Sequence, residues 1–185
     1  MRYLIVCGGK IDKEFGLNEI KTDGIDAIIA ADSGMDFLYE NGVTPDIIVG
    51  DFDSATTKSL EYFERKGQTE IHRLNPIKDD TDTEYAIRLA IREGARSIVL
   101  LGATGSRIDH VLGNISLLGI GLESGTDISI IDTNNRIRMA DRPVTIEKSA
   151  QYGRFVSLIA VTDDNEVSLR GFKYPVTDYS FDRFT

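Results

Sequence analysis

The chain has 185 residues, of which 41% are hydrophobic, so it can form one large domain or a medium and a small domain around a real core. Its formal net charge of −9 disfavours partners that are polyanions, namely nucleic acid and anionic membranes. Cys7 is the one cysteine and no apolar stretch approaches the roughly 20 residues that span a bilayer, which excludes an intrachain disulfide and predicts a cytoplasmic protein.

Short β-branched runs alternate with helical patterns through residues 1–132. The predicted strands are Tyr3–Cys7, Ala27–Ala31, Ile47–Val49, Ile71–Leu74, Ser97–Leu101 and Ile128–Ile131. The clearest helix runs from Thr81 to Glu93 and opens with a capping box formed by Thr81 and Glu84. This alternation predicts an α/β domain with a mostly parallel sheet and helices on both of its faces.

After Thr133 the pattern changes to strands joined by turns. The predicted strands here are Arg136–Met139, Val144–Lys148, Phe155–Val161 and Glu166–Arg170. Residues 133–185 therefore form a second, all-β domain behind the α/β domain of residues 1–132. A domain of this size is too small for a strong core, so we expect it to depend on the first domain or on a second subunit.

Acidic residues follow several of the predicted strands. In open parallel sheets ligands bind beyond the carboxyl ends of the strands, so these residues are expected at one edge. The segments are Asp32-Ser33-Gly34, Gly50 to Ser54, Asn75 to Asp82 and Gly102 to His110.

Asp51 and Asp53 are two residues apart, so in an extended segment both carboxylates face one side while Phe52 turns inward. Two such charges about 4 Å apart repel by about 4 kcal/mol at an effective dielectric constant near 20, which a cation relieves. Oxygen ligands favour Mg²⁺. The alternative is that both residues serve a turn and a helix cap.

Asp79, Asp80 and Asp82 precede or begin the predicted helix near Thr81. Acids in a first helical turn also complement the helix dipole, at about 0.3–1 kcal/mol each, which is the alternative here. Three acids exceed that need. Together with Asp51 and Asp53 they favour a metal site.

Residues 102–107, Gly-Ala-Thr-Gly-Ser-Arg, lead from a strand into a helix and offer N–H groups, hydroxyls and a guanidinium to an anion. They match neither a Walker A loop nor a dinucleotide fingerprint, and a plain tight turn explains them equally well. Asp109 is placed to hold a metal or accept a proton, and His110 to make a polar contact. These parts predict Mg-dependent transfer that involves a nucleotide phosphate.

The chain resembles the thiamine pyrophosphokinase family. The resemblance rests on four segments and the asparagine after them: residues 31–34, 45–54, 78–84 and 101–110, and Asn114. It implies an α/β catalytic domain, a small β-sandwich that binds thiamine, a homodimer with active sites between subunits, and transfer of pyrophosphate from ATP to thiamine with release of AMP.

The resemblance also implies roles for individual residues. The metal ligands would be Asp51, Asp53, Asp79 and Asp82. The catalytic residues would be Asp51, Asp53, Asp82 and Asp109. ATP would contact Asp32, Gly34, Gly102, Thr104, Gly105, Ser106 and Arg107, and the substrate would contact His110 and Asn114. Asp82 or Asp53 would accept the proton of the attacking hydroxyl.

Family members usually continue past the position of Thr185 with a strand that helps to hold thiamine, so we expect the second domain to be truncated in this sequence. Two other functions compete with this interpretation. A glycosyltransferase would use the Asp-x-Asp pair to hold a metal on a nucleotide sugar, and a non-catalytic sensor would bind Mg-ATP without turnover.

Overall fold

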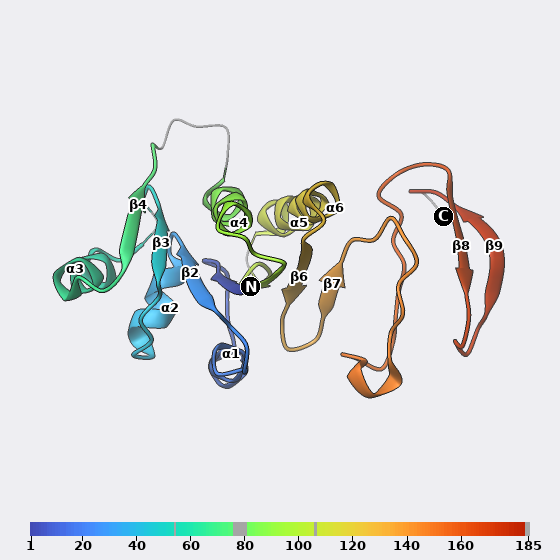
Figure 1. The fold of residues 1–185 in the computed structure, drawn as a ribbon, viewed down its shortest axis with the longest axis horizontal. Coiled ribbons are helices and arrows are strands. Elements are labelled where there is room, and N and C mark those ends of the chain that lie inside the picture. Colours follow the sequence, from blue (N-terminus) through green and yellow to red (C-terminus); the bar gives the residue numbers. More distant parts are fainter. Residues whose placement is uncertain (54, 76–80, 106, 184–185) are drawn as a thin grey trace. The chain divides into compact units, whose positions relative to one another are not determined.

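The computed structural model describes residues 1–53, 55–75, 81–105 and 107–183. Its contacts divide the chain into two units, Met1–Tyr152 and Gly153–Thr185. In the first unit, strands and helices alternate as far as β6 (Figure 1). Its strands are β1 (Arg2–Val6), β2 (Ala27–Ala31), β3 (Ile47–Gly50), β4 (Glu70–Arg73), β5 (Ser97–Leu101), β6 (Asp127–Ile131) and β7 (Arg136–Arg138). Its helices are α1 (Lys13–Ile20), α2 (Gly34–Glu40), α3 (Thr57–Lys66), α4 (Asp82–Arg92), α5 (Ile108–Leu117) and α6 (Gly119–Ser124), with a 3₁₀ turn at Lys148–Ala150.

Within the described residues, the strands of this unit form one seven-stranded sheet in the order β4-β3-β2-β1-β5-β6-β7. Neighbouring strands from β4 to β6 are parallel, and β7 alone is antiparallel to its neighbour. The register places Ile5 beside Ile29 on one side and beside Leu100 on the other. The predicted, mostly parallel sheet is therefore confirmed.

Apolar side chains alternate between the two faces of the sheet and build a core on each. Tyr3 and Ile5 of β1 face a cluster completed by α4 and by Leu118 and Ile120. Leu4 and Val6 of the same strand face the opposite cluster, which receives Met35 and Leu38 of α2. Helices α4 to α6 and helices α1 to α3 lie on opposite sides of the sheet in Figure 1. The prediction of helices on both faces is thus confirmed.

Several predicted bounds agree closely with the structure. Strands β2 and β5 have the predicted residues, and β1, β3, β4 and β6 differ at their ends by one residue. Helix α4 is capped by Thr81, whose side chain accepts a hydrogen bond from the Glu84 N–H at 3.1 Å. This bond is the half of the predicted capping box that the structure shows.

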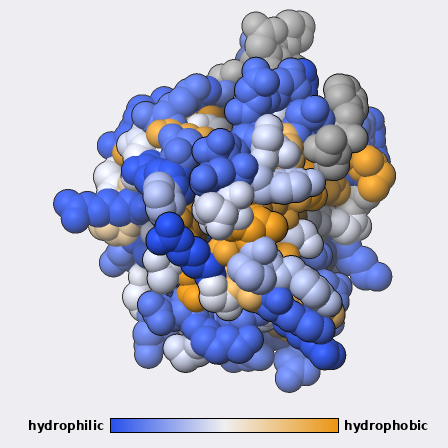
Figure 2. Space-filling view, turned by 90° about the vertical axis from the view of Figure 1, so that its right-hand side faces the viewer, coloured by the Kyte–Doolittle hydropathy of each residue, from blue (hydrophilic) through white to orange (hydrophobic). Residues whose placement is uncertain are grey.

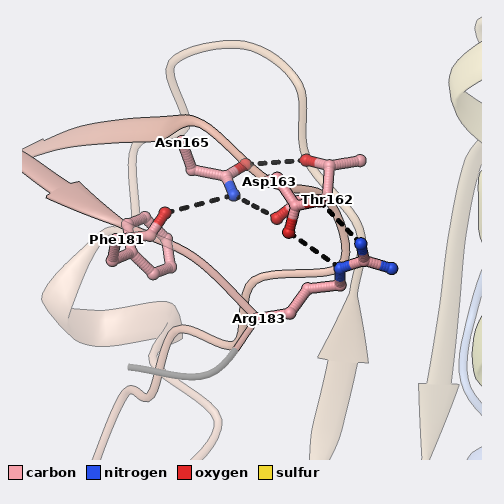
Figure 3. Close-up of polar contacts among 5 residues, drawn as sticks. All are labelled: Thr162, Asp163, Asn165, Phe181 and Arg183. Carbon is pink, nitrogen blue, oxygen red and sulfur yellow. Dashed lines mark hydrogen bonds and ion pairs between the residues drawn. The ribbon is translucent and has the colours of Figure 1, made fainter.

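The second unit contains an antiparallel pair, β8 (Asn165–Leu169) and β9 (Val176–Phe181). Figure 3 shows the polar contacts around its open end. The Arg183 guanidinium donates to both carboxylate oxygens of Asp163, at 2.9 and 2.6 Å. The Asn165 side chain donates to the backbone oxygens of Thr162 and Phe181. These bonds tie the residues before β8 to the end of β9.

Two predicted strands are wrong. Residues 144–148 and 155–161 lie within the described part of the chain and contain no strand. Their apolar side chains are exposed instead of paired across a sheet, as Phe155 and Ile159 show. Strand β9 was not predicted from the sequence. The fold class itself, an α/β sheet followed by a β unit, is confirmed.

The predicted boundary between a catalytic domain, residues 1–132, and a thiamine-binding domain, residues 133–185, stays a prediction. By contacts the first unit extends to Tyr152, because β7 adds to the main sheet. Among the described residues, the helices are too short or too polar to reach across a bilayer.

Candidate functional site

Several of the predicted site residues directly follow the carboxyl ends of β2, β3 and β5. Strand β1 lies between β2 and β5 in the sheet. The chain leaves β1 toward α1, which packs on one face, and leaves β5 toward α5, which packs on the other. Such a switch point between diverging loops is where open α/β sheets bind ligands.

The loops at this edge are packed backbone against backbone. The Gly9 N–H donates to the Gly102 oxygen at 2.8 Å, and a Cβ on Gly9 would lie 2.3 Å from that oxygen. A Cβ on Gly34 would lie 2.0 Å from the Val6 oxygen. Side chains at either position would push the loops apart, so glycine here has a structural reason that needs no ligand.

Three carboxylates meet at this edge. One oxygen from each of Asp32, Asp51 and Asp53 lies within 4.8 Å of the others. Asp32 follows β2, and the other two follow β3. Asp32 and Asp51 are half-buried, while Asp53 is exposed. An all-oxygen cluster of this size suits a hard divalent cation. We call these three residues the acidic triad.

The backbone around Phe52 differs from the expected extended segment. Phe52 has a φ of +66°, a conformation that L-residues seldom adopt. Its ring nevertheless turns inward to the core, as predicted, and the Arg73 guanidinium lies 5.4 Å from the ring centre. The two carboxylates therefore meet through a tight turn, and the Asp53 N–H donates to the Asp51 side chain at 3.1 Å.

Asp32 is the electrostatically unfavourable member of the triad. Its pKa is raised, first by burial and further by the charges of Asp82, Asp51 and Asp53, although a hydrogen bond from the Ser33 backbone acts in the opposite direction. Its Oδ1 is buried and has no hydrogen-bond partner among the described residues. A buried carboxylate oxygen without a donor, facing other acids, fits a position that a cation would complete.

Asp82 begins α4 and is close enough to Asp32 for its charge to contribute to the raised pKa. It is not a member of the acidic triad. Asp79 and Ser106, which the sequence placed in the metal and ATP sites, lie outside the described residues.

Hydrogen bonds to Asp132, which follows β6, and from Asn114 of α5 fix the turn after β5. Thr104 donates its hydroxyl to Asp132 at 2.8 Å, and the Asn114 side chain donates to the Ala103 oxygen at 2.8 Å. Gly102 and Gly105 have positive φ angles of 73° and 80°. The side chains of Thr104 and Asn114, predicted to contact ATP and substrate, thus also fix the shape of this turn.

Arg107 and Asp109 form a two-pronged ion pair at the start of α5. The Arg107 Nε and Nη2 donate to the two Asp109 oxygens at 3.1 and 2.6 Å. The guanidinium lowers the pKa of Asp109, so this carboxylate is a weaker base than an ordinary aspartate. His110 is exposed beside it, and its N–H donates to Asp109.

Sequence reasoning missed two features. Asp32 was assigned to ATP, but the structure groups it with Asp51 and Asp53; the acidic run after each strand was the available signal. Lys10 was not assigned at all, although its backbone packs against Gly105, where an added Cβ would lie 3.2 Å away. Its place directly after β1, within the glycine-rich loop, was the available signal.

Two family models match the chain. Residues 21–130 match the catalytic domain of thiamin pyrophosphokinase, and residues 143–184 match its vitamin B1 binding domain. The thiamine pyrophosphokinase of Bacillus subtilis (strain 168) is 36% identical over 152 residues, which cover 81% of this chain and 70% of that protein.

Solved structures with the same fold are similar over most of their length. The crystal structure of the Bacillus subtilis thiamine pyrophosphokinase has a TM-score of 0.83 at 33% identity, over 97% of this chain and 83% of that one. The enzyme from Geobacillus thermodenitrificans has a TM-score of 0.78 at 27% identity, over 100% and 84%.

Proposed function

Because the chain belongs to the thiamin pyrophosphokinase family, we propose that its acidic triad holds the magnesium ion of that family's reaction. The chain has thiamine pyrophosphokinase activity, in which a pyrophosphoryl group passes from ATP to thiamine. Thiamine and ATP are therefore its substrates. This activity replaces the glycosyltransferase and the nucleotide sensor that the sequence alone left open.

The observation that carries the metal site is the convergence of Asp32, Asp51 and Asp53 within 4.8 Å. The buried Oδ1 of Asp32 supports it. Asp82 belongs to the same negative surroundings, because its charge acts on Asp32. Bound there, Mg²⁺ supplies the positive charge that phosphate oxygens need as the bond to AMP breaks.

ATP lies along the turn after β5 and the loop after β1. The turn presents Gly102, Thr104, Gly105 and Arg107 near the N-terminus of α5, where backbone N–H groups favour an anion. Lys10 adds a cation from the neighbouring loop: it is exposed, and no described acid forms an ion pair with it. Gly34 keeps α2 close to β1 beside this place.

The proton of the thiamine hydroxyl passes to Asp53 or Asp82. Asp109 suits this role less well, because Arg107 lowers its pKa; its carboxylate instead orients Arg107. His110 and Asn114 lie on α5 next to the turn and are the candidates for contact with the substrate.

We also propose that the protein works as a homodimer. Figure 2 shows hydrophobic surface exposed between polar side chains on one face. Many large apolar side chains are exposed in the stretch that covers the vitamin B1 binding match, among them Val144, Phe155, Leu158, Ile159 and Tyr174. Surface of this kind favours burial against a partner.

Replacing Asp53 by Asn tests the role of the triad. Asp53 is exposed, so the fold should survive, but the loss of one ligand charge should lower turnover by about 100-fold or more. Phosphorus NMR of ATP, Mg²⁺ and thiamine follows AMP and thiamine diphosphate directly. The matched control is Asp23→Asn, an exposed acid before β2, which should keep normal turnover. Near-normal turnover of Asp53→Asn would sink the assignment.

A further inference from the structure

The side chain of Asp36, on α2, binds the start of α3. Its carboxylate accepts hydrogen bonds from the Thr56 N–H, at 3.1 Å to Oδ2, and from the Thr56 hydroxyl, at 2.8 Å to Oδ1. The Ser59 hydroxyl also contacts Oδ1, and Ser59 is fully buried. We call Asp36, Thr56 and Ser59 the α2–α3 clamp.

The clamp supplies N-terminal capping interactions that the residues of α3 do not supply. Thr56 is the N-cap of α3, but its side chain makes no capping bond within the helix. The first turn of α3 also contains no acid. Asp36 therefore supplies, from another helix, both the acceptor and the negative charge that a helix N-terminus favours.

The clamp is connected to the acidic triad on both sides. Asp36 lies four residues after Asp32, and Thr56 lies three residues after Asp53. Helix α2 is itself fixed, because Met35 and Leu38 are fully buried and Gly34 packs against the Val6 carbonyl. A bond from α2 to the start of α3 thus limits how far Asp53 can move from Asp32.

The triad needs such a restraint. Three carboxylates within 4.8 Å of one another repel when they are ionised. Strand β3 and the inward-packed ring of Phe52 hold Asp51 and Asp53 from the N-terminal side. The clamp adds an attachment on the C-terminal side, which opposes movement of Asp53 away from Asp32 when no cation is bound.

We propose that Asp36 is a positioning residue for the cation site: through Thr56 and Ser59 it holds the segment of Asp51 and Asp53 against Asp32, so that the triad is assembled before the ion arrives. This inference rests on the proposed function in one respect, that the triad is the cation site. Asp36 itself touches neither ion nor substrate.

The test is Mn²⁺ binding to the whole protein without substrates, measured by electron paramagnetic resonance of the unbound ion. Asp36→Asn should weaken Mn²⁺ binding by about 10-fold or more, as loss of residues that orient metal ligands does elsewhere. Turnover of this variant should recover at high Mn²⁺, since the chemistry is intact. Ser59→Ala removes the contacts of the Ser59 hydroxyl with Asp36 and Thr56 but leaves both bonds between Asp36 and Thr56. It should weaken binding by a smaller factor and guards against a misfolded Asp36 variant.

The matched control is Asp46→Asn. The Asp46 carboxylate also accepts a backbone hydrogen bond, from Ile28 at 2.8 Å, but at the amino ends of β2 and β3. It should lose stability without losing Mn²⁺ affinity. Equal Mn²⁺ affinity of Asp36→Asn and the unchanged protein, or an equal loss in Asp46→Asn, would overturn the inference.

Asp51→Asn separates this inference from the proposed function. If Asp51→Asn weakens Mn²⁺ binding and Asp36→Asn does not, the cation site stands and the positioning role falls. If Asp51→Asn also binds Mn²⁺ normally, the triad is not the cation site and both fall.

Discussion

Asp32 combines three features that destabilise the folded state. It is a non-glycine residue with a φ of +48°, its Oδ1 has no partner within the described part of the chain, and neighbouring acids act on its charge. Each of these features opposes folding, and such costs persist where function requires them. Asp32 is therefore the position at which stability and cation binding should trade against each other most clearly.

Replacing Asp32 by Asn should stabilise the metal-free protein at neutral pH. The pKa of Asp32 is raised in the folded state, so its ionised form opposes folding at pH values above that pKa, and the penalty disappears as pH falls through it. Asparagine removes the charge and tolerates the positive φ.

For a gain of about 1 kcal/mol we expect the melting temperature to rise by about 2–4 °C at pH 7.5, and the difference to vanish toward pH 4. Thermal unfolding in the presence of a chelator measures both. A melting temperature that falls, or a gain that stays constant down to pH 4, would contradict this account of Asp32. The same variant should bind Mn²⁺ more weakly.

The sequence predicted that the segments of Asp32, Asp51 and Asp53 reach one edge of the sheet, but not that these three carboxylates form one group. Asp51 and Asp53 were expected together, and the structure adds Asp32 from the next strand. That grouping depends on the turn at Phe52 and on the positive φ of Asp32, which residue types alone do not determine. The bonds from Thr104 to Asp132 and from Asp36 to Thr56 join distant segments and left no local signal.

Helices α2 and α4 show what could be predicted of single elements. The bounds of α4 followed from its cap and its apolar period, both of which are local. Helix α2 has only seven residues, and its importance comes from its contacts with β1 and α3 rather than from its own pattern. Local signals thus located the helix that carries Asp82 but not the helix that holds the triad together.

Some strands could also be predicted from local sequence, and others could not. Those of the parallel sheet were predicted to within a residue, and for most of them the reason is a buried run of Ile, Val, Leu and Ala; β4, with Glu-Ile-His-Arg, is the exception. Residues 144–148 and 155–161 have similar apolar content but form no strand. Pairing needs a neighbouring strand as well as a suitable sequence, and strands β7 and β9 show that short or polar segments can pair when a neighbour is present.

For the assembled protein, the exposed apolar side chains of the C-terminal stretch predict association. Phe155 and Ile159 are 82% and 85% exposed. Replacing both by Ser should convert the proposed homodimer to a monomer, because it removes apolar area that a partner would cover. Light scattering coupled to size-exclusion chromatography measures the mass.

Glu166→Gln, a change at an exposed polar position in the same unit, is the control and should leave the proposed dimer intact. A monomeric unchanged protein, or a double variant that stays dimeric, would count against this assignment of the interface.

Carboxylates that follow two neighbouring strands of one sheet are proposed to share a divalent ion next to the triphosphate. The most direct measurement is the anomalous scattering of Mn²⁺ in crystals grown with an ATP analogue whose α–β bridge cannot be cleaved. We expect an anomalous peak within bonding distance of a phosphate oxygen and of at least two of Asp32, Asp51 and Asp53. A well-bound ion on the analogue with none of the three carboxylates around it would contradict the account.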